Sequence, residues 1–196
     1  MTDLKNLRLG VALCGSFCTF KKTITMIETL IALGVDVYPI MSFNAYHTST
    51  RFGDAKDFIE LIESLTGKPI IHTLVDAEPL GPKHLIDAIL VAPCTGNTLS
   101  KMAHAIIDTP VVLATKSLMR NSKPVIIALS TNDGLGLNMK NIGELIGIKN
   151  IFFVPFGQDS AFTKPFSLIS DFTLVPETLQ KALHQEQLQP ILIHHT

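Results

Sequence analysis

An uninterrupted apolar run, from Ala88 to Ala92, is followed directly by a cluster of small and polar residues. Because the run lacks any alternation of apolar and polar residues, it predicts a strand buried on both faces of a parallel sheet. Ligands of open α/β sheets bind in the crevice at the carboxyl ends of such strands. The cluster therefore predicts a cofactor-holding loop, although a plain helix N-cap at Thr95 or Asn97 would explain one of its polar groups. Its members are Pro93, Cys94, Thr95, Gly96, Asn97 and Thr98.

Strand and helix patterns alternate along the whole chain, which calls for a parallel sheet with helices on both faces. We expect strands at 7–13, 35–41, 69–74, 88–92, 124–129 and 151–155. We expect helices at 23–33, 54–65, 83–86, 99–107, 138–146 and 176–184, and a helical or extended segment at 111–119. No repeat or linker divides the 196 residues, a length that suits one well-packed domain. The prediction is a single Rossmann-like (flavodoxin-like) α/β domain over residues 1–196.

Composition narrows the classes of function. The net charge of -1 argues against binding to nucleic acid or to an anionic membrane surface, because both need a basic stripe. No apolar run reaches the ~20 residues of a membrane helix, and the polar start lacks a secretory signal, so we expect a cytoplasmic protein. Apolar residues make up 46% and charged residues 17%, a balance that predicts apolar surface buried between subunits of a homo-oligomer.

The cysteines and histidines do not form a recognisable metal site. Cys14, Cys18 and Cys94 are an odd number in a chain without an export signal, which is typical of a reduced cytosolic protein. Cys14 and Cys18 are four residues apart, but no second pair and no suitably spaced histidine cluster completes a zinc site. We therefore predict no metal.

Three further polar loops follow predicted strands. The first, Gly15 to Lys21, offers backbone N–H groups, a hydroxyl and the positive end of a helix dipole, which together hold a phosphate. It matches neither G-x-G-x-x-G nor the P-loop, and Ser16 as a plain N-cap explains it equally well. The other two are Ser42 to Ala45 and the segment 129–136. Since parallel strands present their carboxyl ends at one edge, all four loops should converge on one crevice.

Together these loops resemble the homo-oligomeric flavin-containing cysteine decarboxylases, a flavoprotein family that includes phosphopantothenoylcysteine decarboxylases, lantibiotic peptide decarboxylases and flavin prenyltransferases. The family pattern G-S-I-A-A-Y-K is matched by Gly15 to Lys21, and Ser/Thr-x-x-Ala by Ser42 to Ala45. The signature P-A-S-A-N-T is matched by Pro93 to Thr98, with Lys101 and Asp108 at the positions that follow it. The resemblance implies bound FMN near a subunit interface of a trimer or dodecamer. The implied FMN-binding residues are Gly15, Ser16, Phe17, Ser42, Ala45, Pro93, Cys94, Thr95, Gly96, Asn97 and Thr98.

Departures from the family pattern bear on the reaction. The position of the decarboxylases' catalytic histidine falls on Pro79, and both methionines of their second motif are missing. That motif keeps its asparagine as Asn132, which in the family contacts the substrate carboxylate. The arginine of the prenyltransferases falls on Leu129, which cannot bind phosphate. A flavin-dependent decarboxylase or prenyltransferase is therefore the alternative rather than the main expectation.

Three blocks, 92–98, 130–138 and 154–159, resemble one branch of the family. In that branch the chain works with a second, nucleotide-binding Rossmann subunit during sporulation, and the hydride acceptor is flavin or an NAD(P) on that partner. Together the two chains oxidise a dihydrodipicolinate-type intermediate to dipicolinate, the spore-core calcium chelator, in the mother-cell cytoplasm. A different class also stays open, in which the chain is a non-catalytic partner that activates the second subunit.

The implied oxidation needs dicarboxylate recognition and a base. Thr131, Asn132 and Asp133 are the candidate substrate-binding residues, and Asn132 and Glu78 the candidate catalytic residues. Asp133 is a second candidate base. Lys116 and Arg120 would meet a carboxylate, unless they belong to a solvated helix face.

Overall fold

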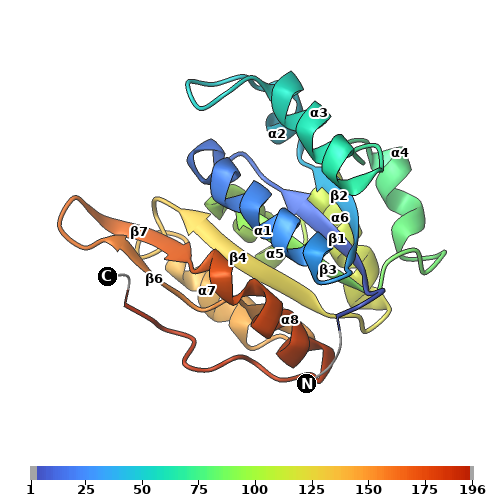
Figure 1. Ribbon diagram of the computed structural model, residues 1–196. Helices are drawn as coiled ribbons and strands as arrows, with labels where there is room; N and C mark the ends of the chain where they lie inside the picture. The colour runs from blue at the N-terminus through green and yellow to red at the C-terminus, as the bar shows by residue number, and fades with distance from the viewer. Residues whose placement is uncertain (1–3, 195–196) are drawn as a thin grey trace.

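A seven-stranded sheet runs through the centre of the computed structural model, which describes residues 4–194 (Figure 1). The strand order is β2-β1-β3-β4-β7-β6, and β5 pairs with β4 off this path. β1, β2, β3, β4 and β5 are parallel neighbours, whereas β6 and β7 form an antiparallel hairpin that β7 joins to β4. The strands are β1 (Arg8–Leu13), β2 (Asp36–Met41), β3 (Ala88–Cys94), β4 (Val125–Thr131), β5 (Ile151–Phe153), β6 (Phe156–Ser160) and β7 (Lys164–Ser170).

Helices cover both faces of the sheet, as predicted. Residues of α1, α3 and α8 pack with one set of strand side chains, and residues of α5, α6 and α7 pack with the other. In β3, Leu90 faces the first layer and Val91 the second, and both are fully buried. The described helices are α1 (Phe20–Ala32), α2 (Phe43–His47), α3 (Ala55–Thr66), α4 (Leu74–Ala77), α5 (Gly96–Ala103), α6 (Pro110–Arg120), α7 (Met139–Ile146) and α8 (Val175–Leu183), with 3-10 turns η1 (Phe17–Thr19), η2 (Glu78–Leu80) and η3 (Phe172–Leu174).

The segment between α3 and β3 differs from the prediction. The expected strand at 69–74 is reduced to a single bridge between Ile71 and Ile40. Thr73 instead starts a helix, because its hydroxyl accepts the backbone N–H of Asp76 at 3.1 Å and so caps α4. The expected helix at 83–86 is a turn, in which His84 has a φ of 49°.

The hairpin after Pro155 is an element that the sequence analysis did not predict. β5 pairs only with the first half of β4, from Val125 to Ile127, so the second half is left for β7. Ser170 joins the two partners, since its hydroxyl accepts the Leu129 N–H at 2.8 Å and donates to the Val154 carbonyl at 3.0 Å. The sheet is therefore mostly parallel, as predicted, and ends at this edge in an antiparallel hairpin.

The chain end covers the outer edge of the hairpin. The Phe156 N–H donates to the Ile191 carbonyl at 2.9 Å, and the Ile193 N–H donates to the Phe156 carbonyl at 3.0 Å. These bonds occupy backbone groups that a free edge strand would expose. Among the described residues, no helix combines the length and apolar character needed to span a lipid bilayer.

Candidate functional site

One cavity of about 1080 Å³ lies at the carboxyl ends of β1 to β4, and all four predicted polar loops line it. The convergence of these loops is thus confirmed. The hairpin adds a further wall through Asp159, Lys164 and Ser167. Figure 1 shows the hairpin on the same side of the molecule as the loop between α2 and α3.

The Gly15 loop is tied to the end of β4. Ser16 precedes η1 but makes no capping bond; its Oγ lies 2.8 Å from the Oγ of Ser130 instead. The hydroxyl of Thr19 donates to the Ser16 carbonyl at 2.7 Å and tightens the turn before α1. The amino end of α1, with its partial positive charge, therefore sits beside a fixed pair of hydroxyls.

The loop after β3 provides both a helix N-cap and polar groups that face the cavity. Thr95 is the N-cap of α5, because its hydroxyl accepts the Thr98 N–H at 3.3 Å. The Thr98 hydroxyl donates to the sulfur of Cys14 at 3.2 Å and holds the loop to β1. Asn97 is exposed and lines the cavity, so its amide is available to a ligand. The cap also explains why α5 begins three residues before the predicted start.

The first turn of α5 rests on a carboxylate held by neutral donors. Asp133 accepts hydrogen bonds from the hydroxyl of Thr131 at 2.6 Å and from the side-chain amide of Asn138 at 2.9 and 2.8 Å. Gly96 lies against this group: a Cβ there would collide with the Asn138 amide nitrogen and lie 2.7 Å from the Thr131 hydroxyl. Only glycine leaves the arrangement intact.

Two of the cations that line the cavity are neutralised by neighbours. Lys101 pairs with Asp108 at 2.8 Å, and Lys164 pairs with Asp159 at 2.5 Å. A hydrogen bond from Lys164 to Asp159 raises the pKa of Lys164 and keeps it charged.

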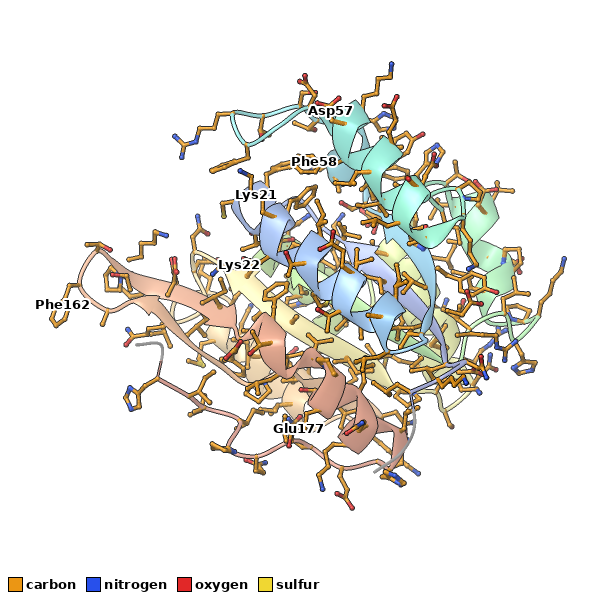
Figure 2. All side chains as sticks on the ribbon, viewed as in Figure 1. Lys21, Lys22, Asp57, Phe58, Phe162 and Glu177 are labelled. Carbon is orange, nitrogen blue, oxygen red and sulfur yellow. The ribbon has the colours of Figure 1, made fainter. Side chains whose placement is uncertain are left out.

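The other two lining cations, Lys22 and Arg51, form no ion pair within residues 4–194. The Arg51 guanidinium lies 4.9 Å from the centre of the Phe52 ring, on the loop before α3. Figure 2 shows Lys22 between α1 and the hairpin. These two charges are free to meet an anionic ligand.

Most of the residues predicted for the site are brought together. Three of them are buried and do not line the cavity, namely Ala45, Pro93 and Cys94. The predicted residues that line it are Gly15, Ser16, Phe17, Ser42, Thr95, Gly96, Asn97, Thr98, Thr131, Asn132 and Asp133.

Burial separates Cys94 from any ligand. Its side chain is fully buried, and desolvation raises its pKa well above the usual value. The same cause raises the pKa of Cys14 to about 11. Both residues are neutral thiols of the core, whereas Cys18 is exposed and lines the cavity. The expectation that Cys94 touches a flavin ring is not met by this placement.

Glu78 also lies away from the cavity. It is exposed on η2, which packs on α6. α6 begins after Thr109, which lines the cavity, and then runs away from the cavity. Because η2 packs on the later turns of α6, η2 lies away from the cavity too. Figure 1 shows α4, which directly precedes η2, at the opposite end from the hairpin. The candidates Lys116 and Arg120 lie on α6 and are not among the lining residues.

Sequence reasoning missed several lining residues. Asn138 and Asp159 fell inside the blocks that carried the resemblance, so that signal could have found them. Lys22, Arg51 and Phe52 lie outside those blocks, and only the tertiary structure brings them to the cavity.

The cavity lining fits a flavin. It combines the hydroxyls of Ser16 and Ser130 with three aromatic side chains, Phe17, Phe43 and Phe52. Aromatic walls with a few placed polar groups are typical of cofactor sites, whose volumes run from roughly 300 to 1,000 Å³. The volume here, about 1080 Å³, lies just above that range. In residues 4–194, no group of three or more His, Cys, Asp or Glu side chains is placed to hold a metal ion.

Comparison with known proteins gives consistent results. The family model described as Flavoprotein matches residues 1–169. The dipicolinate synthase B-subunit of Bacillus subtilis (strain 168) is 47% identical over 195 residues, which cover 100% of this chain and 98% of that protein.

Solved structures extend the comparison. The crystal structure of the dipicolinate synthase B-subunit from Bacillus halodurans has a TM-score of 0.91 at 42% identity, with 100% of both chains covered. The FMN-dependent cysteine decarboxylase SpaF has a TM-score of 0.68 at 22% identity, covering 92% of this chain and 99% of that chain, and so shares the fold. The B-subunit relatives support an enzyme-related role, and the Flavoprotein family model supports a flavin cofactor.

Proposed function

The chain belongs to the Flavoprotein family, and from this premise we propose that it is an FMN-binding component of a two-part dipicolinate synthase. The observation that carries the proposal is the joining of four strand-end loops into one cavity. That cavity is lined by hydroxyls, amides, aromatic rings and two cations without an ion pair among the described residues, which suits a flavin together with a small dicarboxylate.

The flavin phosphate is held by the Gly15 loop in this proposal. The Ser16 hydroxyl and the amino end of α1 supply a donor and a favourable dipole for an anion. Asn97 and Thr95 border the rest of the cofactor. When bound, a flavin supplies a hydride acceptor.

The substrate is a dihydrodipicolinate-type dicarboxylate. Arg51 binds one carboxylate with its two-pronged guanidinium, and Lys22 adds a second positive charge. The amide of Asn132 orients the carboxylate at the end of β4. The neutral lining around Asp133 keeps that group available for proton transfer.

A second polypeptide completes the synthase. The relatives are named as one component of a multi-part synthase, which supports a partner, and we propose that this partner is the nucleotide-binding subunit that carries an NAD(P) site. The tip of the hairpin offers a contact point, because Phe162 is 99% exposed and points away from the body of the molecule (Figure 2). Exposed aromatic side chains are enriched at interfaces. We further propose that copies of this chain assemble with each other and act in the cytoplasm of sporulating cells.

The test is an absorbance spectrum of the purified chain with and without added FMN, followed by assays of dipicolinate formation with and without the nucleotide-binding partner. Flavin bands together with product only when both proteins are present are the expected result. Product without any flavin binding would leave the chain as an activator of that partner. Loss of carbon dioxide from a cysteine-type substrate would identify a decarboxylase instead.

A further inference from the structure

Asp133 stands at the end of a chain of buried side-chain amides. The Asn138 oxygen that faces away from Asp133 accepts a hydrogen bond from the side-chain amide of Asn141 at 2.7 Å. Asn138 is 7% exposed and Asn141 is 3% exposed, so this chain is part of the interior. The Asn141 side-chain oxygen has no hydrogen-bond partner among the described residues.

Burying a side-chain amide costs free energy unless its polar atoms are hydrogen-bonded, and the Asn141 oxygen is left without that compensation among the described residues. Here their alignment is fixed, because the Asn141 donor occupies the Asn138 oxygen and turns the Asn138 amide nitrogen toward Asp133, 2.9 and 2.8 Å from its two oxygens. The Asp133 carboxylate is thereby held in one orientation, with its edge on the cavity.

Asp133 differs from the two other carboxylates that line the cavity. Asp108 and Asp159 are each paired with a lysine, whereas no ion pair involves Asp133 within residues 4–194. A carboxylate offers about four acceptor sites, and two donor groups, the Thr131 hydroxyl and the Asn138 amide, bind the Asp133 carboxylate. Acceptor capacity is therefore left for a proton donor in the cavity.

We propose that Asn138, backed by Asn141, is a positioning residue that holds the Asp133 carboxylate aimed at the substrate as its proton acceptor. The proposal rests on the proposed function, since the substrate is taken to be a dihydropyridine-type ring. Glu78, the other candidate base, lies outside the cavity and cannot serve.

Aromatisation of the ring removes a hydride and a proton. One ring C–H bond breaks with transfer of a hydride to a flavin- or nicotinamide-type acceptor. A second ring hydrogen leaves as a proton to the free oxygen site of Asp133, and the electron pair of that bond completes the aromatic ring. Asp133 then releases its proton to water.

Other charges face the same space and enter the pH dependence. Those on the elements around Asp133 are Lys22 of α1, Arg51 of the loop before α3, Lys101 of α5 with Asp108, and Asp159 with Lys164 of the hairpin. The exposed thiol of Cys18 also faces this space. Lys140 and Glu144 of α7 are exposed to solvent.

The test is the variant Asn138→Asp, which has nearly the same shape but places a second negative charge beside Asp133. Like charges in one site disfavour ionisation, so the titration midpoint of Asp133, followed by carboxyl-carbon NMR on the chain alone, should rise by about one pH unit or more. In the assembled enzyme, kcat at neutral pH should fall about tenfold and recover as the pH is raised, with KM little changed.

The matched control is Asn6→Asp, which adds the same charge at an exposed position before β1. It should leave the Asp133 midpoint unchanged. If Asn138→Asp does not fold, Asn138→Ser removes the amide donor without adding charge and should raise the midpoint by a smaller amount.

The outcomes separate the two proposals. An unchanged Asp133 midpoint in a folded Asn138 variant overturns the positioning role, whatever the enzyme does. A shifted midpoint with an unmoved pH profile of kcat shows that Asp133 is not the proton acceptor and overturns the catalytic role. If the Asp133 midpoint shifts but the chain forms no dipicolinate with the nucleotide-binding partner, the interaction between Asn138 and Asp133 stands and the proposed function is rejected.

Discussion

The cavity has a floor and a rim that are built in opposite ways. The floor consists of Ser16, Thr98, Ser130, Thr131, Asp133 and Asn138, which are buried or half-buried and hydrogen-bonded to other protein groups. The rim consists of Lys22, Arg51, Phe52 and Lys164, which are exposed. The floor belongs to strand ends and helix starts, whereas the rim belongs to the outer face of α1, a loop and the hairpin.

The difference indicates that the floor and the rim have separate roles in binding. Floor groups cannot move without breaking bonds to one another, so they can hold a cofactor and a base in fixed geometry. Two rim residues, Lys22 and Arg51, carry unpaired charge on long side chains within the described residues, so they can attract an anionic ligand and adapt to it. Changes in the floor should therefore affect stability and cofactor binding, and changes in the rim should affect substrate binding alone.

The largest effect is expected from Gly96→Ala. The added methyl group collides with the Asn138 amide and crowds the Thr131 hydroxyl, so the free energy of unfolding should fall by about 1–3 kcal/mol, as for other overpacked sites. Flavin binding should be weakened in parallel. Urea denaturation of the variant and the parent measures the first effect, and flavin titration the second.

Gly143→Ala is the control for that comparison. Gly143 lies in α7, and a Cβ there would meet nothing within 4 Å. Alanine should therefore stabilise the helix by about 0.5–1 kcal/mol. Equal destabilisation by both variants would mean that the floor is not the rigid part of the site.

Arg51→Ala tests the rim. Loss of a charged hydrogen-bond partner for a carboxylate is worth about 1.5–3 kcal/mol, so KM for the dicarboxylate should rise at least about tenfold. The free energy of unfolding should stay the same, because Arg51 is exposed and lies over the Phe52 ring. Steady-state kinetics measure KM for this variant and for the control Arg120→Ala, which removes an exposed arginine outside the cavity. A similar KM for both variants would contradict the role given to Arg51.

Ser16→Ala and Ser130→Ala sharpen the description of the floor. Each variant removes the same 2.8 Å hydrogen bond, but only the first removes the hydroxyl proposed to hold the flavin phosphate. A hydrogen bond contributes about 1 kcal/mol, so flavin affinity should fall about fivefold in the first variant and less in the second. Titration by fluorescence quenching measures both, and equal losses would remove Ser16 from the phosphate site.

The smallest effect is expected from labelling the cysteines with a thiol reagent, which requires no substitution. Burial raises the pKa of Cys14 to about 11, so at about pH 8 only about one molecule in a thousand carries its thiolate. Cys18 alone should react rapidly with a thiol reagent in the native protein, and all three cysteines after denaturation. Protection of Cys18 by added flavin would place the cofactor at the Gly15 loop. Rapid labelling of Cys94 would show that the floor opens.

Much of the architecture could be predicted because local patterns and burial agree. The continuous apolar run of β3 has no wet face, and it is indeed fully buried between the two helix layers. Glycine at the end of α3 supplies the left-handed backbone, with a φ of 65° at Gly67, that stops the helix where the sequence suggests. Strand ends of a parallel sheet must meet at one edge, and for this reason the four polar loops could be assigned to one site.

Three of the errors share one cause, which is a local signal overridden by a distant partner. The segment 156–170 has no clear strand alternation, yet the half of β4 left unpaired by the short β5 makes it a hairpin. Glu78 lies beside residues that suggest a loop, but η2 packs on α6 and stays away from the cavity. Cys94 sits in the right loop, and its side chain nevertheless turns into the core.

The sequence by itself determined the alternation of strands and helices, the apolar strand cores and the polar composition of the loops, because each depends on residues close together in the chain. Only the tertiary structure decided which of those polar groups face the cavity and which bond to each other. The pairing of Ser16 with Ser130 spans 114 positions, and Gly96 meets Asp133 across a sheet edge. Such contacts follow from strand order and helix packing, which no local pattern encodes.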